Sequence, residues 1–202
     1  LSSEIGVGRV LTRLIKILRE NSGAQTVQLL LQNEAGWCIE GSTSGDETEV
    51  LQSRAVRIDD TDSKFFPLSL VRYVLRTGEE IVEENLSNNV GYAGDPYCIA
   101  HRPKSVMCLP IKRFSQVAGV IYLENNLAAD VFTRDRARFV RMLGVQAIIS
   151  IDNARLYQSL EHKVEERTRE LHAKNDVLVS TQKQLVAQEK LASLGVLTAG
   201  IA

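Results

Sequence analysis

The sequence has little cysteine, little proline and almost no net charge. Its 202 residues include 3 cysteines and 4 prolines, and 25 acidic residues balance 24 basic ones to a formal net charge of -1. Three scattered cysteines are too few for a disulfide framework, so we interpret Cys38 and Cys108 as small buried hydrophobes and expect a reducing, cytoplasmic location. The even charge predicts neither a nucleic acid nor an anionic membrane as partner.

Long apolar runs and catalytic motifs are also missing from the sequence. No stretch approaches the roughly 18 to 20 apolar residues of a membrane-spanning helix. The opening LSSEIGVGRV lacks the basic and apolar regions of a signal peptide and has no initiator Met, and the chain stops on Ile201-Ala202, so we expect a fragment cut at both ends. Neither a phosphate-binding loop nor a nucleophile elbow occurs, so the chain itself is not expected to be an enzyme.

Apolar periodicity and end signals predict an α+β domain. Gly23 and Gly78 follow helical patterns as stops, and Asp95-Pro96 is a capping residue followed by a first-turn proline. We expect helices over 5–21, 67–77, 96–101 and from Thr133 onward, and strands over 26–31, 37–41, 54–58, 80–85, 105–111 and 117–125. Strands joined through hairpins, with helices before and after, indicate an antiparallel sheet in a domain over 1–152.

The long helix after Thr133 carries two apolar stripes. One consists of Phe139, Met142, Leu143, Gln146 and Ile149, and the other of Val140, Gly144, Ala147, Ile151 and Ala154. One stripe is expected to pack on the domain's own sheet. The stripe rich in small residues, with Val140, Ala147, Ile151 and Ala154, is expected to contact a partner helix.

Residues 153–186 have the pattern of a coiled-coil linker. Val164, Leu171, Leu178 and Leu185 recur every seven residues, whereas the companion column from Leu160 is largely polar. So narrow an apolar stripe predicts a marginal parallel homodimer, and a solvated single helix is the alternative. Beyond Leu185 the phase shifts to Leu191, Leu194, Thr198 and Ile201, as expected at a joint between modules.

The final segment, EKLASLGVLTAGIA (189–202), resembles the start of the dimerization helix of sensor histidine kinases. The resemblance implies that the phosphoacceptor histidine would come next, that 187–202 begins that helix, and that the parent protein is an ATP-dependent histidine kinase. A kinase catalytic domain and a response regulator would then be its partners. Residues 154–171 are similar to linkers that precede histidine kinase cores, and also to those that precede nucleotide cyclases.

Three upstream segments resemble the GAF domain, a small-molecule sensor module. They are NSGAQTVQLLL, RPKSVMCLPI, and VAGVIYLENN with the helix FTRDRARFVRMLGVQAIISIDNARLY. These segments are similar to those in the GAF domain of large bacterial proteins that also contain a Ser/Thr kinase-like domain, an AAA-type ATPase and a histidine kinase. The resemblance implies an antiparallel sheet with helices on one face and a ligand pocket on the other.

Several residues are candidates for lining that pocket. Cys98 and His101 are candidates for holding a bilin or haem, and Cys98 is also a candidate redox thiol. The sequence lacks the adjacent Cys-His pair of bilin attachment, and no third Cys or His lies nearby to complete a metal site. We therefore predict no metal site and leave the cofactor open. The aromatic candidates, which either line a cavity or fill it, are Phe65, Phe66, Tyr92 and Tyr97.

These inferences predict a sensory and dimerization fragment of a two-component histidine kinase. In this interpretation a change in the GAF domain shifts the rotation or register of a parallel helical dimer. Two alternatives stay open: a GAF scaffold that dimerises without a ligand, and the sensor segment of a nucleotide cyclase. A metabolite that raises the melting temperature would argue against the scaffold.

Overall fold

The structure is a computed structural model, and it describes the backbone of residues 4–33, 36–44, 47–49, 54–61, 63–86 and 89–199. Side chains are described over 7–33, 36–43, 54–61, 63–86 and 89–186. Internal contacts divide the chain into two units, Leu1–Ala154 and Arg155–Ala202.

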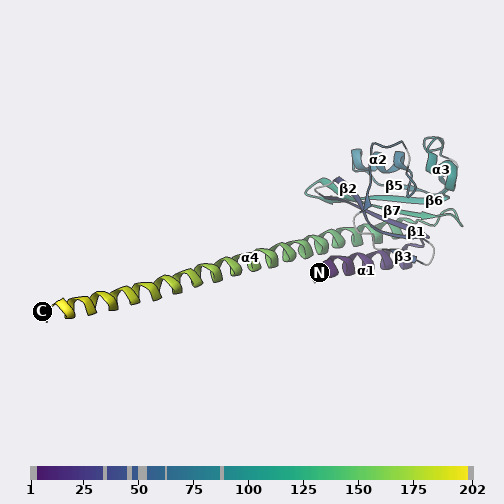
Figure 1. The fold of residues 1–202 in the computed structure, drawn as a ribbon. Helices are drawn as coiled ribbons and strands as arrows, with labels where there is room; N and C mark the ends of the chain where they lie inside the picture. The colour runs from purple at the N-terminus through teal and green to yellow at the C-terminus, as the bar shows by residue number, and fades with distance from the viewer. Residues whose placement is uncertain are drawn as a thin grey trace. The chain divides into compact units, whose positions relative to one another are not determined.

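The first unit is built on an antiparallel sheet (Figure 1). Its strands are β1 (Thr26–Asn33), β2 (Gly36–Ser44), β3 (Glu47–Glu49), β4 (Arg54–Ala55), β5 (Ile81–Glu83), β6 (Ser105–Arg113) and β7 (Gln116–Asn125). The helices are α1 (Glu4–Ser22), α2 (Leu68–Thr77), α3 (Pro96–His101) and α4 (Arg134–Ala199). Among the described residues the strand order is β3-β2-β1-β7-β6-β5, with β4 paired to β2. The predicted α+β fold with an antiparallel sheet is confirmed.

Local signals set most element ends where they were expected. Gly23 and Gly78 both have positive φ, +79° and +66°, and the Gly78 amide closes α2 on the Val74 carbonyl. The α3 helix begins at Pro96 behind Asp95 and ends at His101, as predicted.

Several element boundaries differ from the expectation. Pro67 is the residue before α2 rather than its first member, because its ψ of 113° is extended. The strand expected over 54–58 contains only Arg54–Ala55, and the one expected over 80–85 only Ile81–Glu83. The strand Glu47–Glu49 was not predicted; its polar sequence carries no alternation of apolar residues.

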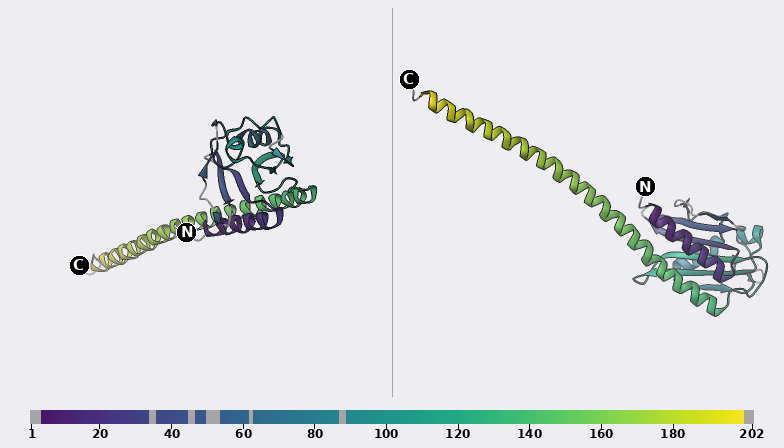
Figure 2. Two further views of the ribbon diagram at one scale, coloured as in Figure 1. Left: turned by 90° about the vertical axis from the view of Figure 1, so that its right-hand side faces the viewer. Right: turned by 90° about the horizontal axis from the view of Figure 1, so that it is seen from below.

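Each face of the sheet is covered by its own apolar core. Ile121 and Leu123 of β7 pack with α1 and the first part of α4, whereas Val120 and Tyr122 pack with α2. Figures 1 and 2 show α1 and α4 on one side of the sheet and α2 on the other. The alternation follows from the strand period of two. It gives the domain one face of long helices and one of short helices and loops.

The α4 helix buries the stripe that was expected to meet a partner, so that stripe packs on the domain's own sheet instead. Val140, Ala147 and Ile151 are 0%, 5% and 1% exposed within the domain's own core. A Cβ on Gly144 would lie 3.0 Å from Ile121 Cδ1, so the small residues serve close contact with the sheet. Ala154 is half-buried at the end of this unit.

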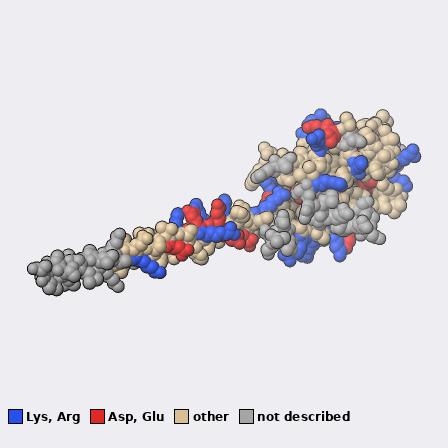
Figure 3. All heavy atoms as spheres, in the orientation of Figure 1, with Lys and Arg blue, Asp and Glu red and all other residues tan. Residues whose placement is uncertain are grey.

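The second unit, Arg155–Ala202, contains the remainder of α4. Its heptad residues Val164, Leu171, Leu178 and Leu185 are 65%, 65%, 67% and 60% exposed. Basic and acidic side chains lie along the same helix (Figure 3). Arg167 and Lys174 both form ion pairs with Glu170 at 2.7 Å. Leu191 and Leu194 lie outside the described side chains.

In the part of the chain that the structure describes, no helix is both long and apolar enough to cross a bilayer.

Candidate functional site

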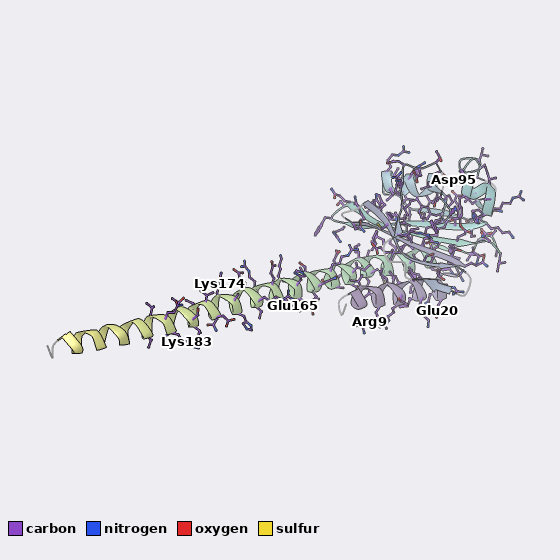
Figure 4. All side chains as sticks on the ribbon, in the orientation of Figure 1. Arg9, Glu20, Asp95, Glu165, Lys174 and Lys183 are labelled. Atoms are coloured by element: carbon purple, nitrogen blue, oxygen red, sulfur yellow. The ribbon has the colours of Figure 1, made fainter. Side chains whose placement is uncertain are left out.

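One carboxylate joins the two short helices on the face opposite α1. Asp95 Oδ1 accepts a hydrogen bond from the Tyr97 amide at 2.9 Å and so caps α3. Its Oδ2 accepts from the amide of Ser69 at 2.9 Å and from the Ser69 hydroxyl at 2.6 Å, in the first turn of α2. Asp95 is labelled beside α3 in Figure 4. Since Pro67 has no side-chain acceptor for α2, the buried Asp95 satisfies the amino ends of both helices.

A second buried carboxylate holds α3 to the sheet. Glu124, at the end of β7, is 2% exposed. Its Oε2 accepts from the Tyr97 hydroxyl at 2.9 Å and the Tyr122 hydroxyl at 2.5 Å, and its Oε1 accepts from Asn126 Nδ2 at 2.7 Å. Burial, reinforced by Glu124, raises the pKa of both tyrosines, so their hydroxyls stay protonated as donors. Three donors make this buried carboxylate a structural anchor.

Two hollows lie beside these anchors. The first, of about 320 Å³, is lined by Leu86, Ala93, Cys98, Ile99, Arg102 and Pro103. The second, of about 710 Å³, is lined by Trp37, Ile58, Asp59, Ser69, Arg72, Tyr73, Leu75, Arg76, Gly91 and Tyr92. Ser69 belongs to the larger hollow and also bonds Asp95, so the helix anchor forms part of its wall.

The six predicted pocket residues do not converge on one cavity. Cys98 lines the smaller hollow and Tyr92 the larger one. Phe66 is fully buried, with its ring centroid 6.1 Å from that of Tyr122, and so fills the core. Phe65 lies under the Arg54 guanidinium, 4.8 Å from ring centroid to Cζ.

The remaining two predicted residues contact each other. His101 is exposed, and its ring stacks on that of the buried Tyr97 with centroids 4.2 Å apart. The stack places His101 over the outer face of a ring whose hydroxyl is held by Glu124. Sequence reasoning missed Glu124, although its alternation with Tyr122 and Val120 along β7 is a signal for an inward side chain.

The Cys98 thiol lacks the environment of a reactive cysteine. It is half-buried, and burial, followed by Asp95 and Glu124, raises its pKa to about 12. A nucleophilic or redox-sensing thiol needs a lowered pKa, so Cys98 is protonated and poorly reactive at neutral pH. Cys108, with 0% exposure, and Cys38, with 2%, are buried as expected from the sequence.

The two buried carboxylates of this face are engaged in structural hydrogen bonds. Neither carboxylate lies free for proton transfer, since each accepts at least two described hydrogen bonds. Within the described ranges, no three His, Cys, Asp or Glu side chains gather as metal ligands. Aromatic and cationic side chains, including Trp37, Tyr73 and Arg76, line the larger hollow, and side chains of these kinds are common in small-molecule sites.

The chain is similar to parts of several fungal and amoebal histidine kinases. It is 32% identical over 90 residues to hybrid signal transduction histidine kinase G of Dictyostelium discoideum, covering 45% of this chain and 3% of that protein. Peroxide stress-activated histidine kinase mak3 of Schizosaccharomyces pombe is 23% identical over 185 residues, covering 91% of this chain and 7% of that protein. The chain therefore spans less than a tenth of the length of these curated relatives.

Solved structures agree on the fold of the first unit. The GAF domain of an Acinetobacter phosphoenolpyruvate-protein phosphotransferase matches with a TM-score of 0.57 and 18% identity over 75% of this chain and 85% of its own. The GAF domain of a two-component sensor histidine kinase from Bacillus halodurans matches with a TM-score of 0.55 and 16% identity over 74% and 96%. The family model of the GAF domain matches residues 7–151, and the chain belongs to the GAF domain family.

Proposed function

We propose that this chain is the sensory and relay module of a histidine kinase, in which the face carrying α2 and α3 receives the signal and α4 transmits it through a parallel homodimer. In the whole protein, residues 1–152 are the sensor, 153–186 the coiled-coil linker, and 187–202 the start of the dimerization helix. A kinase catalytic domain and a response regulator complete the pathway in the cytoplasm.

The observation that carries this proposal is the dual character of α4. Ile148 and Ile151 belong to the sensor core, and the same helix, Arg134–Ala199, carries the exposed heptad stripe of Val164 and Leu171. A helix that is a core element at one end and a dimerization stripe at the other can turn a change in core packing into a change in helix pairing. The similarity to histidine kinases supports the kinase as the output.

Polar positions in the stripe's companion column support a switchable dimer. Arg167 and Lys174 recur seven residues apart where a stable coiled coil carries apolar side chains. Such positions lower the stability of one packing and keep others close to it in free energy.

The input side of the proposal is the larger hollow beside α2. Its aromatic lining fits a small planar ligand, and its Ser69 wall is held by Asp95. A ligand that displaces this wall changes how α2 and α3 sit on the sheet. Cys98 and His101 belong to the same face. Cys98 lines the smaller hollow, and His101 stacks on the Tyr97 ring.

An insertion series in a protein that carries this chain ahead of a histidine kinase core tests the relay. One, two, three or four alanines inserted after Ser180 rotate the helix beyond them, whereas seven residues restore the heptad phase. We expect autophosphorylation to vary with insertions of one to four and to return with seven. A kinase rate that is the same for every insertion would contradict transmission through helix phase.

A further inference from the structure

The sheet ends at β5, and among the described residues no further strand pairs with its outer side. β5 (Ile81–Glu83) is the last strand in the sheet order and pairs with β6 on one side only. Along an antiparallel strand, successive residues direct their amide and carbonyl groups to alternate sides. At least one residue of β5 therefore directs both groups away from β6, toward a position that an added strand can occupy.

A hollow of about 480 Å³ lies between this strand and the first part of α4. Its lining includes three apolar side chains, Val82, Phe132 and Ala137. Phe132 and Ala137 are each only 4% exposed, so they form the floor of the hollow. The hollow thus combines an apolar floor with an open strand edge.

Two contacts give the direction of α4 along β5. The Glu84 carbonyl, just after the strand, accepts a hydrogen bond from the Asp130 amide at 3.0 Å. Glu80, just before the strand, forms a two-pronged ion pair with Arg141 at 2.6 and 2.7 Å. The helix therefore follows the strand in the opposite direction, and residues of α4 between these contacts lie along the hollow.

Two of those residues are arginines whose charges are not neutralised within the described part of the chain. Arg134 and Arg138 both line the hollow and are exposed, and neither forms a hydrogen bond or ion pair with another described residue. Arg141 differs, since it neutralises Glu80. Against the two free guanidinium groups stands the single carboxylate of Glu84, so the hollow is positive overall.

A second hollow continues the first along the same helix. It has a volume of about 350 Å³, shares Glu80 and Arg141 with the first hollow, and adds Lys112 and Val145 to the lining. Lys112 brings a further positive charge. From Arg134 to Val145 the helix rises about 16 Å, which is the length of about five extended residues.

We propose that this groove, the two hollows that lie along α4 from Arg134 to Val145, is a docking site for an extended acidic segment of a partner protein. The segment adds as a strand to the outer side of β5 and places two carboxylates, two residues apart, on Arg134 and Arg138. The proposal concerns the first unit alone and does not depend on the relay through α4.

The spacing of the two arginines identifies the chemistry of the partner. Arg134 and Arg138 are four residues apart on a helix, which separates them by about 6 Å along its axis. Alternate residues of a strand lie about 6 to 7 Å apart and point to the same face. Acidic side chains at alternate positions can therefore each accept a charge-assisted hydrogen bond from one guanidinium. A small anion would leave the apolar floor and the strand edge unused, so an extended segment fits the groove better.

Titration of the full chain with short peptides tests the groove. The probe is the acetylated and amidated peptide TETET, whose two glutamates are two residues apart. TKTKT reverses the charge, and TTEET keeps the composition but places the glutamates side by side. We expect TETET to bind at least about tenfold more tightly than TKTKT, and about threefold more tightly than TTEET, at low salt, where exposed charges are least screened.

The amide signals of β5 locate the bound peptide. In nuclear magnetic resonance spectra of the isotope-labelled chain, TETET should shift the amides of Ile81–Glu83 and of Arg138. Succinate at the same carboxylate concentration is the control for a small anion. Equal shifts with succinate would show a small-anion site, and unchanged signals of Ile81–Glu83 would show adsorption to the arginines alone. Either result overturns the proposal, as does equal binding of the three peptides.

Variants without the charge test the role of the arginines. Arg134→Gln and Arg138→Gln should each weaken the binding of TETET about two- to fivefold, the range of exposed ion pairs, and Arg138→Lys should retain part of the affinity. Arg13→Gln removes the same charge from an exposed position on α1 and is the matched control. Equal melting temperatures confirm that the variants fold. If Arg13→Gln weakens binding as much as Arg138→Gln does, binding follows net charge, and the groove is not the site.

Discussion

At the scale of single residues, Asp95 sets the position of two helices at once. One carboxylate oxygen accepts a hydrogen bond from the amide of Tyr97, and the other accepts hydrogen bonds from the amide and hydroxyl of Ser69. The Asp95-Pro96 sequence predicts the cap on α3, because that contact is local. The bond to Ser69 spans 26 residues and depends on how the chain folds back, which no local pattern contains.

Removing the Asp95 carboxylate should destabilise the domain strongly. We expect Asp95→Ala to lower the free energy of unfolding by about 2–4 kcal/mol, because two helix caps worth roughly 0.5–2 kcal/mol each are lost and buried donors are left unpaired. Asp95→Asn retains one acceptor oxygen and should cost less. Urea denaturation measures both, and equal, negligible losses would contradict the double cap.

The Cys98 thiol offers a prediction with a defined pH dependence. Its pKa of about 12 exceeds the ordinary value of 9.0, so the thiolate is scarce at pH 7.5 and disulfide reagents should react roughly 100- to 1000-fold more slowly than with a free thiol. The rate should rise with pH towards the folded pKa. Cys98→Ser is the control that assigns the signal, and a rate equal to that of a free thiol at pH 7.5 would show that the site lowers the pKa instead.

The raised pKa of Cys98 also makes the stability of the domain fall at alkaline pH. Because the folded pKa lies above the unfolded one, the contribution is fully present below about pH 9 and is lost as pH rises towards 12. Alkaline unfolding of the wild type compared with Cys98→Ser measures it.

At the scale of elements, close contact between α1 and the sheet depends on a glycine. A Cβ on Gly41 of β2 would lie 1.9 Å from Cδ1 of Ile15, a fully buried residue of α1. The apolar spacing of α1 predicts that it packs through Leu11, Leu14 and Leu18. Which strand position must be glycine depends on the approach distance of the helix, and that is a tertiary property.

A rescue experiment tests this contact. We expect Gly41→Ala to destabilise the protein by about 1–3 kcal/mol through overpacking. Ile15→Val removes the clashing methyl group, so it should cost about 0.5–1.5 kcal/mol in the wild type but less, or even stabilise, beside Gly41→Ala. Thermal or urea unfolding of the wild type, the two single variants and the double variant measures the coupling. Strictly additive losses in the free energy of unfolding would show that the two side chains do not meet.

At the scale of the whole molecule, α4 joins core packing to an exposed stripe. Arg134–Ala199 is one helix, and its residues Leu171 and Leu178 remain 65% and 67% exposed. Propensity alone stabilises an isolated helix only marginally in water, which is why we propose a partner for this stripe. The described ion pairs along it, such as Lys174 with Glu170, are surface contacts worth little each.

Removing apolar side chains from the stripe should weaken the proposed dimer. We expect Leu171→Ala with Leu178→Ala to raise the dissociation constant at least about a hundredfold, since two apolar seam contacts are lost from each helix. Val179→Ala removes the same kind of side chain, 42% exposed, from a different face and is the matched control. Sedimentation at several concentrations measures all three proteins, and equal effects of Val179→Ala and the double variant would place the interface elsewhere.

The sequence by itself determined the α+β class, the end of α2 and both ends of α3, because glycine stops, capping residues and apolar periods act over a few residues. It missed the strand Glu47–Glu49, whose polar residues carry no such period. Only the tertiary structure decided which stripe of α4 lies on the sheet, because both stripes are apolar and the choice depends on the close approach that Gly144 and Ala147 permit. The hydrogen bonds from Ser69 to Asp95 and from Tyr97 to Glu124 also depend on the tertiary structure. These partners are 26 and 27 residues apart, and they meet only because α3 packs on the sheet.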